Sequence, residues 1–416
     1  MQTMSKVIKE IPEGWDLHEL GNLGVFSKGK GILKDQVEKA GIACIRYGEI
    51  YTSYNYIVKE FRSFISETVA KESKKINYGD LLFAGSGETI EEIGKCVAYL
   101  NHEEAFAGGD IIILSPNELV NPEYLSYLLE TDFIKKQKRK LGQGNSVVHI
   151  YSSDLKSLII PLPKLPEQKA VASSISSIEN VINKLNHFIS KKEFQKKALM
   201  QQLLTGKKRV KGFDKEWSSV RLRDVFGRVT RKNIKNSLNV VTISAQRGFV
   251  KQEDFFNKTI ASDILTNYFL VKHGEFCYNK SYSNGYPWGA TKRLNSFDEA
   301  VVTTLYICFK LINQDDNSGD FFEHYFESGA LEKGLMKIAH EGGRAHGLLN
   351  VTPTDFFNLT INIPGFEEQT AIANILQTAD QEIQLLKAKA EKLKAQKRGI
   401  MQQLLTGKKR LKPIEI

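Results

Sequence analysis

A ten-residue segment, MQQLLTGKKR, occurs twice in this chain, at residues 200–209 and again at residues 401–410. The offset of 201 residues continues upstream without a gap. Over the 43 positions from Glu167 to Arg209, 19 residues are identical to their counterparts from Glu368 to Arg410. A repeat of this length indicates an internal duplication, which has to be considered before any local motif.

Both copies of the repeat have the apolar spacing of a coiled-coil helix. Apolar residues recur at alternating steps of three and four, which keeps one narrow stripe facing a partner helix. Pro166-Glu167 suits a first helical turn, and Thr205-Gly206 followed by cations suits a helix end. Each helix should cover about 37 residues, or roughly 55 Å. The predicted seam consists of Ile175, Ile178, Ile182, Leu185, Ile189, Leu199, Leu203, Ile372, Leu376, Ile383, Leu386, Leu393, Ile400 and Leu404.

The order of the segments predicts the direction of the two helices. The first helix has to run from the first domain to the second, where the second helix begins, so two helices sharing a seam can only be antiparallel. A pseudo-two-fold axis then gives seam partners whose numbers add up to a constant of 575, for example Ile175 with Ile400. Lys192 and Lys196 interrupt the seam, which is tolerable if their stems pack while their ammonium groups reach water. The alternative is two amphipathic helices packed on separate cores.

Length and composition exclude several classes of protein. A chain of 416 residues is too long for one ordinary domain, and its 41% hydrophobic and 25% charged residues are typical of a soluble globular protein. The start of the sequence has no apolar signal segment and no run is long enough to span a bilayer, so we expect a cytoplasmic protein. The four cysteines are scattered, which indicates reduced thiols. The net charge of +10 favours a polyanionic partner.

Each half of the chain also has a variable part in front of its helix. In the first half we predict strands at 41–51, 80–85, 95–100 and 110–115, a helix at 122–141, and a loop, turn and strand at 141–163. In the second half, residues 303–312 correspond to the last of these four strands and residues 321–339 correspond to the helix. Residues 341–364 correspond to the loop, turn and strand at 141–163. The predicted fold class is α+β, with two similar mixed α/β domains separated by two long antiparallel coiled-coil helices. The expected boundaries are 1–163, 164–210, 211–363 and 364–416.

This layout resembles the specificity (S) subunit of type I restriction-modification enzymes over nearly the whole chain. The resemblance depends on PKLPEQKAVA (163–172), PGFEEQTAIA (364–373) and the two QQLLTGKKR segments, which correspond to the paired repeats that follow each target-recognition domain. It implies that each variable domain reads one half of a bipartite site in double-stranded DNA. It also implies that the helices set the half-site spacing and dock two methyltransferase (M) subunits, and that restriction/translocase (R) subunits join through the complex.

Two short motifs suggest chemistry but are better interpreted as structure. FAGSG (83–87) resembles the loop by which adenine methyltransferases hold S-adenosylmethionine, and NPEY (121–124) resembles their catalytic N-P-P-Y/F motif. The second proline is replaced by Glu123, and the second half has no such loop. The histidines form no ligand pair at helical spacing with a nearby carboxylate. We therefore predict no catalytic residue, no metal site and no cofactor.

Polar, basic and aromatic clusters at predicted turns are the candidates for contacts with DNA, because Arg or Lys pairs with guanine and Asn or Gln with adenine. The run SYSNGYPWGATKR (281–293) is the strongest, since such residues rarely gather in a turn for packing alone. The candidates in the first half are Lys28, Lys30, Arg46, Tyr47, Ser86, Gln143, Asn145 and Ser146. Those in the second half are Arg228, Arg231, Lys232, Arg247, Lys280, Tyr282, Asn284, Tyr286, Trp288, Lys292, Arg293, Arg344 and His346.

The function implied is a non-catalytic DNA-specificity subunit of a complex that methylates adenine and cleaves DNA. Two alternatives remain at this point. One is a self-contained adenine methyltransferase, which would have to bind S-adenosylmethionine as an isolated chain. The other is a free-standing architectural DNA-binding protein whose coil has no protein partner.

Overall fold

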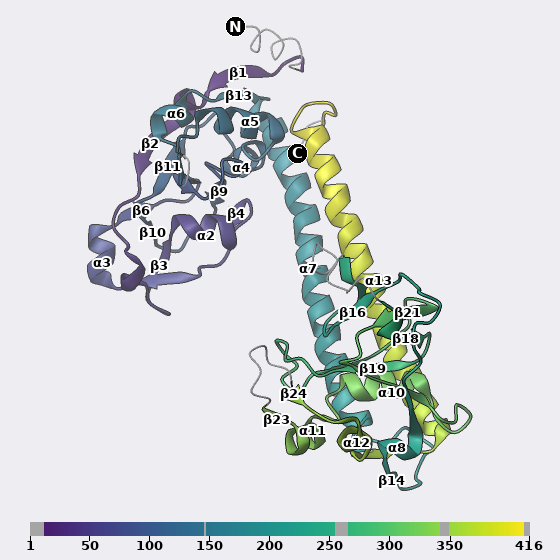
Figure 1. Cartoon of the computed structure of the whole chain (residues 1–416). Helices are drawn as coiled ribbons and strands as arrows, with labels where there is room; N and C mark the ends of the chain where they lie inside the picture. The colour runs from purple at the N-terminus through teal and green to yellow at the C-terminus, as the bar shows by residue number, and fades with distance from the viewer. Residues whose placement is uncertain (1–11, 145–146, 254–264, 342–348, 412–416) are drawn as a thin grey trace. The chain divides into compact units, whose positions relative to one another are not determined.

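The computed structural model describes residues 12–144, 147–253, 265–341 and 349–411 (Figure 1). Contacts within the chain divide it into two compact units, Met1–Leu185 with Lys389–Ile416, and Asn186–Ala388. This division cuts both long helices near their middle, so each unit contains the start of one helix and the end of the other. The four-part division by sequence remains a prediction.

The first unit is built on a five-stranded and a four-stranded sheet. Their strand orders are β2-β11-β7-β9-β4 and β5-β3-β10-β6. The strands are β1 (Asp16–Glu19), β2 (Gly24–Lys28), β3 (Ile42–Ile45), β4 (Ile57–Val58), β5 (Ser63–Ile65), β6 (Lys74–Ile76), β7 (Leu81–Ala84), β8 (Ser86–Gly87), β9 (Cys96–Tyr99), β10 (Ala105–Ala107), β11 (Ile111–Pro116), β12 (Val148–His149) and β13 (Ile159–Leu162). Its short helices are η1 (Leu20–Leu23), η2 (Lys34–Gln36), α2 (Tyr47–Thr52), α3 (Glu67–Glu72), α4 (Pro122–Leu128), α5 (Asp132–Leu141) and α6 (Ser152–Lys156).

The second unit has one four-stranded sheet, β15-β22-β19-β20, and several two-stranded ones. Its strands are β14 (Ser218–Arg221), β15 (Phe226–Val229), β16 (Val241–Ser244), β17 (Gly248–Lys251), β18 (Phe269–Lys272), β19 (Phe276–Asn279), β20 (Ala290–Arg293), β21 (Glu299–Val302), β22 (Ile307–Leu311), β23 (His340–Glu341), β24 (Leu349–Asn350) and β25 (Thr360–Ile363). Its short helices are α8 (Leu222–Val225), η3 (Leu265–Asn267), α10 (Gly319–Glu327), α11 (Glu332–Ile338) and α12 (Pro353–Phe357).

The two units share one plan despite their divergent sequences. The series β2-β11-β7-β9 has the same chain order and pairing as β15-β22-β19-β20, and β1 pairs with β13 as β14 pairs with β25. Gly79 and Gly274 both have positive φ values, 94° and 81°, and the buried carboxylate that follows each accepts a backbone N–H three residues back. The duplication predicted from the repeat therefore extends into the diverged domains.

The long helices α7 (Leu165–Leu203) and α13 (Phe366–Leu404) are each two residues longer than the predicted 37. In the first unit, Val171 and Ile175 of α7 share a core with Met401 and Leu404 of α13. In the second unit, the end of α7 shares a core with the start of α13. Figure 1 shows the ribbons of these two helices side by side. The antiparallel arrangement and the predicted fold class are thereby confirmed.

The fourteen predicted seam residues are all buried or half-buried. Two ion pairs across the helices, Lys196–Asp380 and Lys397–Glu179, have residue numbers that add up to 576, one more than the predicted constant. The ammonium groups do not simply reach water. They pair with carboxylates on the opposite helix. The two ion pairs are equivalent, because Lys196 and Lys397, like Glu179 and Asp380, are related by the offset of 201.

Three predicted elements are wrong in detail. The predicted strand 41–51 is a strand followed by helix α2, because the Glu49 side chain accepts the N–H of Arg46 and caps a new helix. The predicted helices 122–141 and 321–339 are each broken into two. Thr131 begins the second helix of the first pair, and Gly329, with a φ of 79°, separates the second pair. Among the described residues, no helix is long and apolar enough to cross a membrane.

Candidate DNA interface

The strongest candidate segment forms the loop between β19 and β20, which we call the 280–289 loop. The hairpin closes at the pair Asn279–Ala290, and Ser283 and Tyr286 exchange backbone hydrogen bonds of 3.3 and 2.8 Å around a turn. Gly285 has a φ of 83°, as the third position of a type II turn requires. Asn284 is exposed at the tip and Tyr282 is 63% exposed, so both side chains are available to a ligand.

Other residues of the same run are engaged within the unit. The hydroxyl group of Tyr286 donates to Glu327 at 2.6 Å, and Lys292 forms an ion pair with the same carboxylate. Arg293 pairs with Asp320 and lies 3.6 Å from a carboxylate oxygen of Glu323. The half-buried Trp288 packs against the core of the unit. These contacts give Tyr286, Trp288, Lys292 and Arg293 structural roles.

Two more basic side chains of the second unit, those of Arg231 and Lys232, make contacts within the unit. Arg231 makes a bidentate pair with the buried Glu275 at 3.0 and 3.1 Å, and Lys232 donates to the carbonyl of Asn267 at 2.7 Å. Glu275 raises the pKa of Arg231. Lys280 is half-buried, and burial lowers its pKa. Arg228 and Arg247 are exposed, while Arg344 and His346 lie outside the described residues.

The candidates of the first unit lie on several different elements. Lys28, the last residue of β2, and Lys30, two residues further on, are both exposed, and Tyr47 is 41% exposed at the start of α2. Arg46 is bound to the buried Glu49 at 3.2 Å. Gln143 is exposed, while Asn145 and Ser146 lie outside the described residues.

Ser86 is buried, contrary to an exposed reading position, and its hydroxyl group lies 3.0 Å from Nδ1 of His149. The backbone of Gln143 exchanges two hydrogen bonds with His149, so the structure brings Gln143, Ser86 and His149 together. His149 was not among the residues predicted to contact DNA, since no local pattern singles it out. A signal was available for the exposed Lys136, Arg139 and Lys140 of α5, because they form a run of cations within the predicted helix 122–141.

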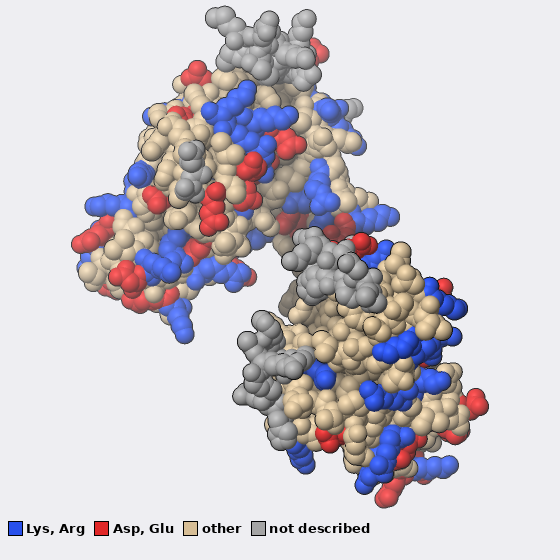
Figure 2. Space-filling model, viewed as in Figure 1, with Lys and Arg blue, Asp and Glu red and all other residues tan. Residues whose placement is uncertain are grey.

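The surface charge does not define an interface by itself. On the face shown in Figure 2, Lys and Arg side chains are spread over both units and Asp and Glu lie among them. Within the described ranges there is no group of three or more residues that could hold a metal ion.

The two motifs that suggested methylation serve the fold of the first unit. Asn121 is the N-cap of α4, and its side chain accepts the N–H of Tyr124 at 2.8 Å. Pro122 occupies the first turn of that helix and Tyr124 is fully buried. Ser86 and Gly87 of the glycine-rich segment pair with β12. NPEY is therefore a helix start, since its aromatic ring is not free to stack on a base.

The fold and these surfaces define a duplicated two-unit protein that presents different exposed residues on a repeated scaffold. The profile described as "Type I restriction modification DNA specificity domain" matches this chain twice, over residues 12–193 and 214–395. The chain therefore belongs to the family of type I restriction-modification specificity subunits. Members of this family recognise DNA and are not themselves catalytic, so neither a self-contained methyltransferase nor an architectural protein is favoured.

The chain is similar to relatives over almost its full length. A specificity subunit assigned to the type I restriction enzyme MjaX of Methanocaldococcus jannaschii is 29% identical, covering 97% of this chain and 96% of the relative. The MjaVIII specificity subunit of the same organism is 24% identical, covering 97% and 94%. In fold, the S subunit from M. genitalium matches with a TM-score of 0.57 at 14% identity, covering 95% of this chain and 96% of that one.

Proposed function

We propose that this chain reads a bipartite sequence in double-stranded DNA, one half with each unit. The observation that carries the proposal is that the two units share one strand arrangement yet present different exposed side chains. The first unit offers Gln143, Tyr47 and the two lysines at the end of β2, Lys28 and Lys30, and the second offers Tyr282 and Asn284. One scaffold with two sets of surface residues suits two different half-sites.

In the second unit, the 280–289 loop is the proposed reading element. Asn284 has an amide that can pair with both edge groups of adenine, and such a bidentate contact carries about 1–3 kcal/mol of discrimination. Within the described part of the chain, neither Asn284 nor Tyr282 makes a side-chain hydrogen bond. Their donors and acceptors therefore remain available for DNA.

We further propose that the long helices set the half-site spacing and bind two methyltransferase subunits, through which restriction subunits join. Exposed apolar side chains on the helices of the second unit support a protein partner. Phe194 of α7 is 76% exposed and Leu385 of α13 is 72% exposed. A protein partner that covers these side chains would remove their apolar surface from water, which favours association.

The test is single-molecule sequencing of methylated DNA from cells that express this chain with a type I methyltransferase subunit that assembles with it. The wild type should methylate one two-part motif. Asn284→Ala should relax or change one half of the motif and preserve the other, because only the second unit carries this residue. Asn374→Ala, at an exposed position of α13 in the same unit, is the control and should leave both halves unchanged. A contiguous motif, or a change in both halves with Asn284→Ala, would contradict the proposal.

A further inference from the structure

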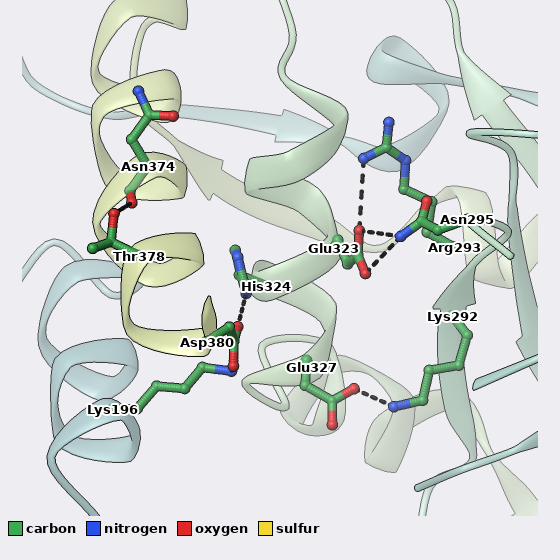
Figure 3. A network of polar contacts seen from close by, with 10 residues as sticks. All are labelled: Lys196, Lys292, Arg293, Asn295, Glu323, His324, Glu327, Asn374, Thr378 and Asp380. Atoms are coloured by element: carbon green, nitrogen blue, oxygen red, sulfur yellow. Dashed lines mark hydrogen bonds and ion pairs between the residues drawn. The ribbon is translucent and has the colours of Figure 1, made fainter. Parts of the chain in front are cut away.

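The carboxylate of Glu327 makes two contacts with the 280–289 loop and its flanking strand β20, and Figure 3 shows one of them, the ion pair with Lys292. Glu327, the last residue of α10, accepts a hydrogen bond of 2.6 Å from the hydroxyl group of Tyr286 on one carboxylate oxygen, and it forms an ion pair with Lys292 through the other. The Lys292 ammonium group also lies 5.1 Å from the centre of the Tyr286 ring. Glu327, Tyr286 and Lys292 therefore form a closed set of contacts, which we call the Glu327 clamp.

The clamp acts on the part of the loop that carries the exposed side chains. Other contacts fix the ends of the loop: Asn279 accepts the N–H of Ser281 at 3.0 Å, and the hydroxyl group of Tyr278 donates to the carbonyl of Trp288 at 2.8 Å. The tip is different, because its side-chain anchor among the described residues is Tyr286. Since Tyr286 closes the turn of which Asn284 is the second residue, holding Tyr286 also holds Asn284.

Packing beneath the loop does not replace this anchor. A cavity of about 250 Å³ separates the loop from the end of α10 and from α11, and its lining includes Gly285, Tyr286, Glu327 and Glu332. A loop over a cavity lacks the close side-chain contacts that fix a core residue. Burial, followed by the hydrogen bond to Glu327, raises the pKa of Tyr286, so its hydroxyl group remains a donor near neutral pH.

We propose that Glu327 is a positioning residue for sequence recognition by the second unit. It holds the turn at 283–286 in the form that presents Asn284 and Tyr282, and it does not contact DNA itself. A carboxylate facing phosphates would be repelled, and its pairing with Lys292 removes this cost. The inference deepens the proposed function and depends on it.

The experiment uses the chain assembled with its methyltransferase and DNA duplexes that carry the methylated motif, with one base changed in either half. Glu327→Ala removes the acceptor for Tyr286 and the partner of Lys292. It should reduce discrimination at the second half-site at least roughly fivefold, the low end for one lost base contact, and leave discrimination at the first half-site unchanged.

Three further variants complete the test. Tyr286→Phe should also reduce discrimination at the second half-site. Glu327→Gln keeps an acceptor oxygen and should restore part of the discrimination. Glu332→Ala is the matched control, because this exposed carboxylate lines the same cavity outside the clamp.

The outcomes separate the inference from the proposed function. Wild-type discrimination in both Glu327→Ala and Tyr286→Phe would overturn the inference, and so would an equal loss at both half-sites, which indicates general destabilisation. If Glu327→Ala fails to fold, Tyr286→Phe and Glu327→Gln decide the question. A wild-type complex that does not recognise a two-part motif would instead refute the proposed function.

Discussion

Lys397 interrupts the coiled-coil seam of the first unit. Its ion pair should contribute more to the free energy of unfolding than exposed ion pairs on the same helices. Lys397 forms an ion pair with Glu179, and their side chains are 10% and 18% exposed. The ammonium group also lies 4.6 Å from the centre of the Tyr56 ring. Lys397→Met keeps a flexible apolar stem at the seam and removes only the charge.

The expected cost follows from the burial of this pair. Removing one partner of an exposed pair costs about 0–1 kcal/mol, and of a fully buried pair about 3–5 kcal/mol. The small exposure of both partners places the loss between these limits, at about 1–3 kcal/mol. The lost cation–π contact adds about 0.5–1 kcal/mol. We expect Lys397→Met to lower the free energy of unfolding by about 1.5–4 kcal/mol.

Two variants test the reasoning by urea denaturation, with an unchanged slope showing that the unfolding transition is the same. Lys387→Met breaks the pair with Glu193, which is 2.6 Å long but has side chains 56% and 47% exposed, and should cost less than about 1 kcal/mol. Lys397→Met combined with Glu179→Met removes both charges and should recover most of the loss. Equal effects of Lys397→Met and Lys387→Met, or a double variant as unstable as the single one, would refute the argument.

Three further predictions follow from the same structure. The affinity of the assembled complex for DNA should fall with salt by a log–log slope of about −0.9 for each phosphate contacted, and a slope near zero would contradict the electrostatic argument. Burial, followed by the charge of Lys196, lowers the pKa of His324, so the neutral form favours the folded state; stability should be lost as the pH falls below the unfolded pKa of about 6.5, and thermal melting of His324→Gln should show a smaller change between pH 7.5 and 5.5. The equivalent fully buried residues Ile175 and Leu376 should each cost about 2–5 kcal/mol when replaced by Ala, and hydrogen exchange should report lost protection in the unit that carries the change.

The sequence predicted the fold well wherever a local pattern determines the structure. The two long helices follow from the seam spacing, and β7, β9 and β11 follow from short apolar runs between turns. The predictions of secondary structure were wrong where a single residue starts or ends a helix inside an apparently continuous element. Glu49 starts α2 inside an apolar stretch, and Gly329 ends α10 inside an apparently continuous helix.

The candidate site was less predictable because a single sequence does not reveal tertiary partners. Arg231 and Glu275 are 44 residues apart, and Lys292 and Glu327 are 35 apart, yet each pair is in direct contact. A basic residue at a turn has the same local pattern whether it faces DNA or a buried carboxylate. Asn284 remains a candidate, whereas Arg293 acquires a structural role, and only the fold distinguishes these two members of one run.

The ten-residue repeat also has a physical explanation. In the second unit, Arg209 binds Glu368 through two hydrogen bonds of 2.7 and 2.6 Å, and in the first unit Arg410 binds Glu167 with the same two distances. The arginine of each copy therefore meets the glutamate of the other copy. Both carboxylates are buried, so a change in either arginine would leave a buried charge without its partner. Because each copy completes the helix start of the other, a substitution in one copy has to be compatible with the glutamate of its counterpart. This mutual dependence explains why both copies carry the same arginine and the same glutamate although the associated domains have diverged.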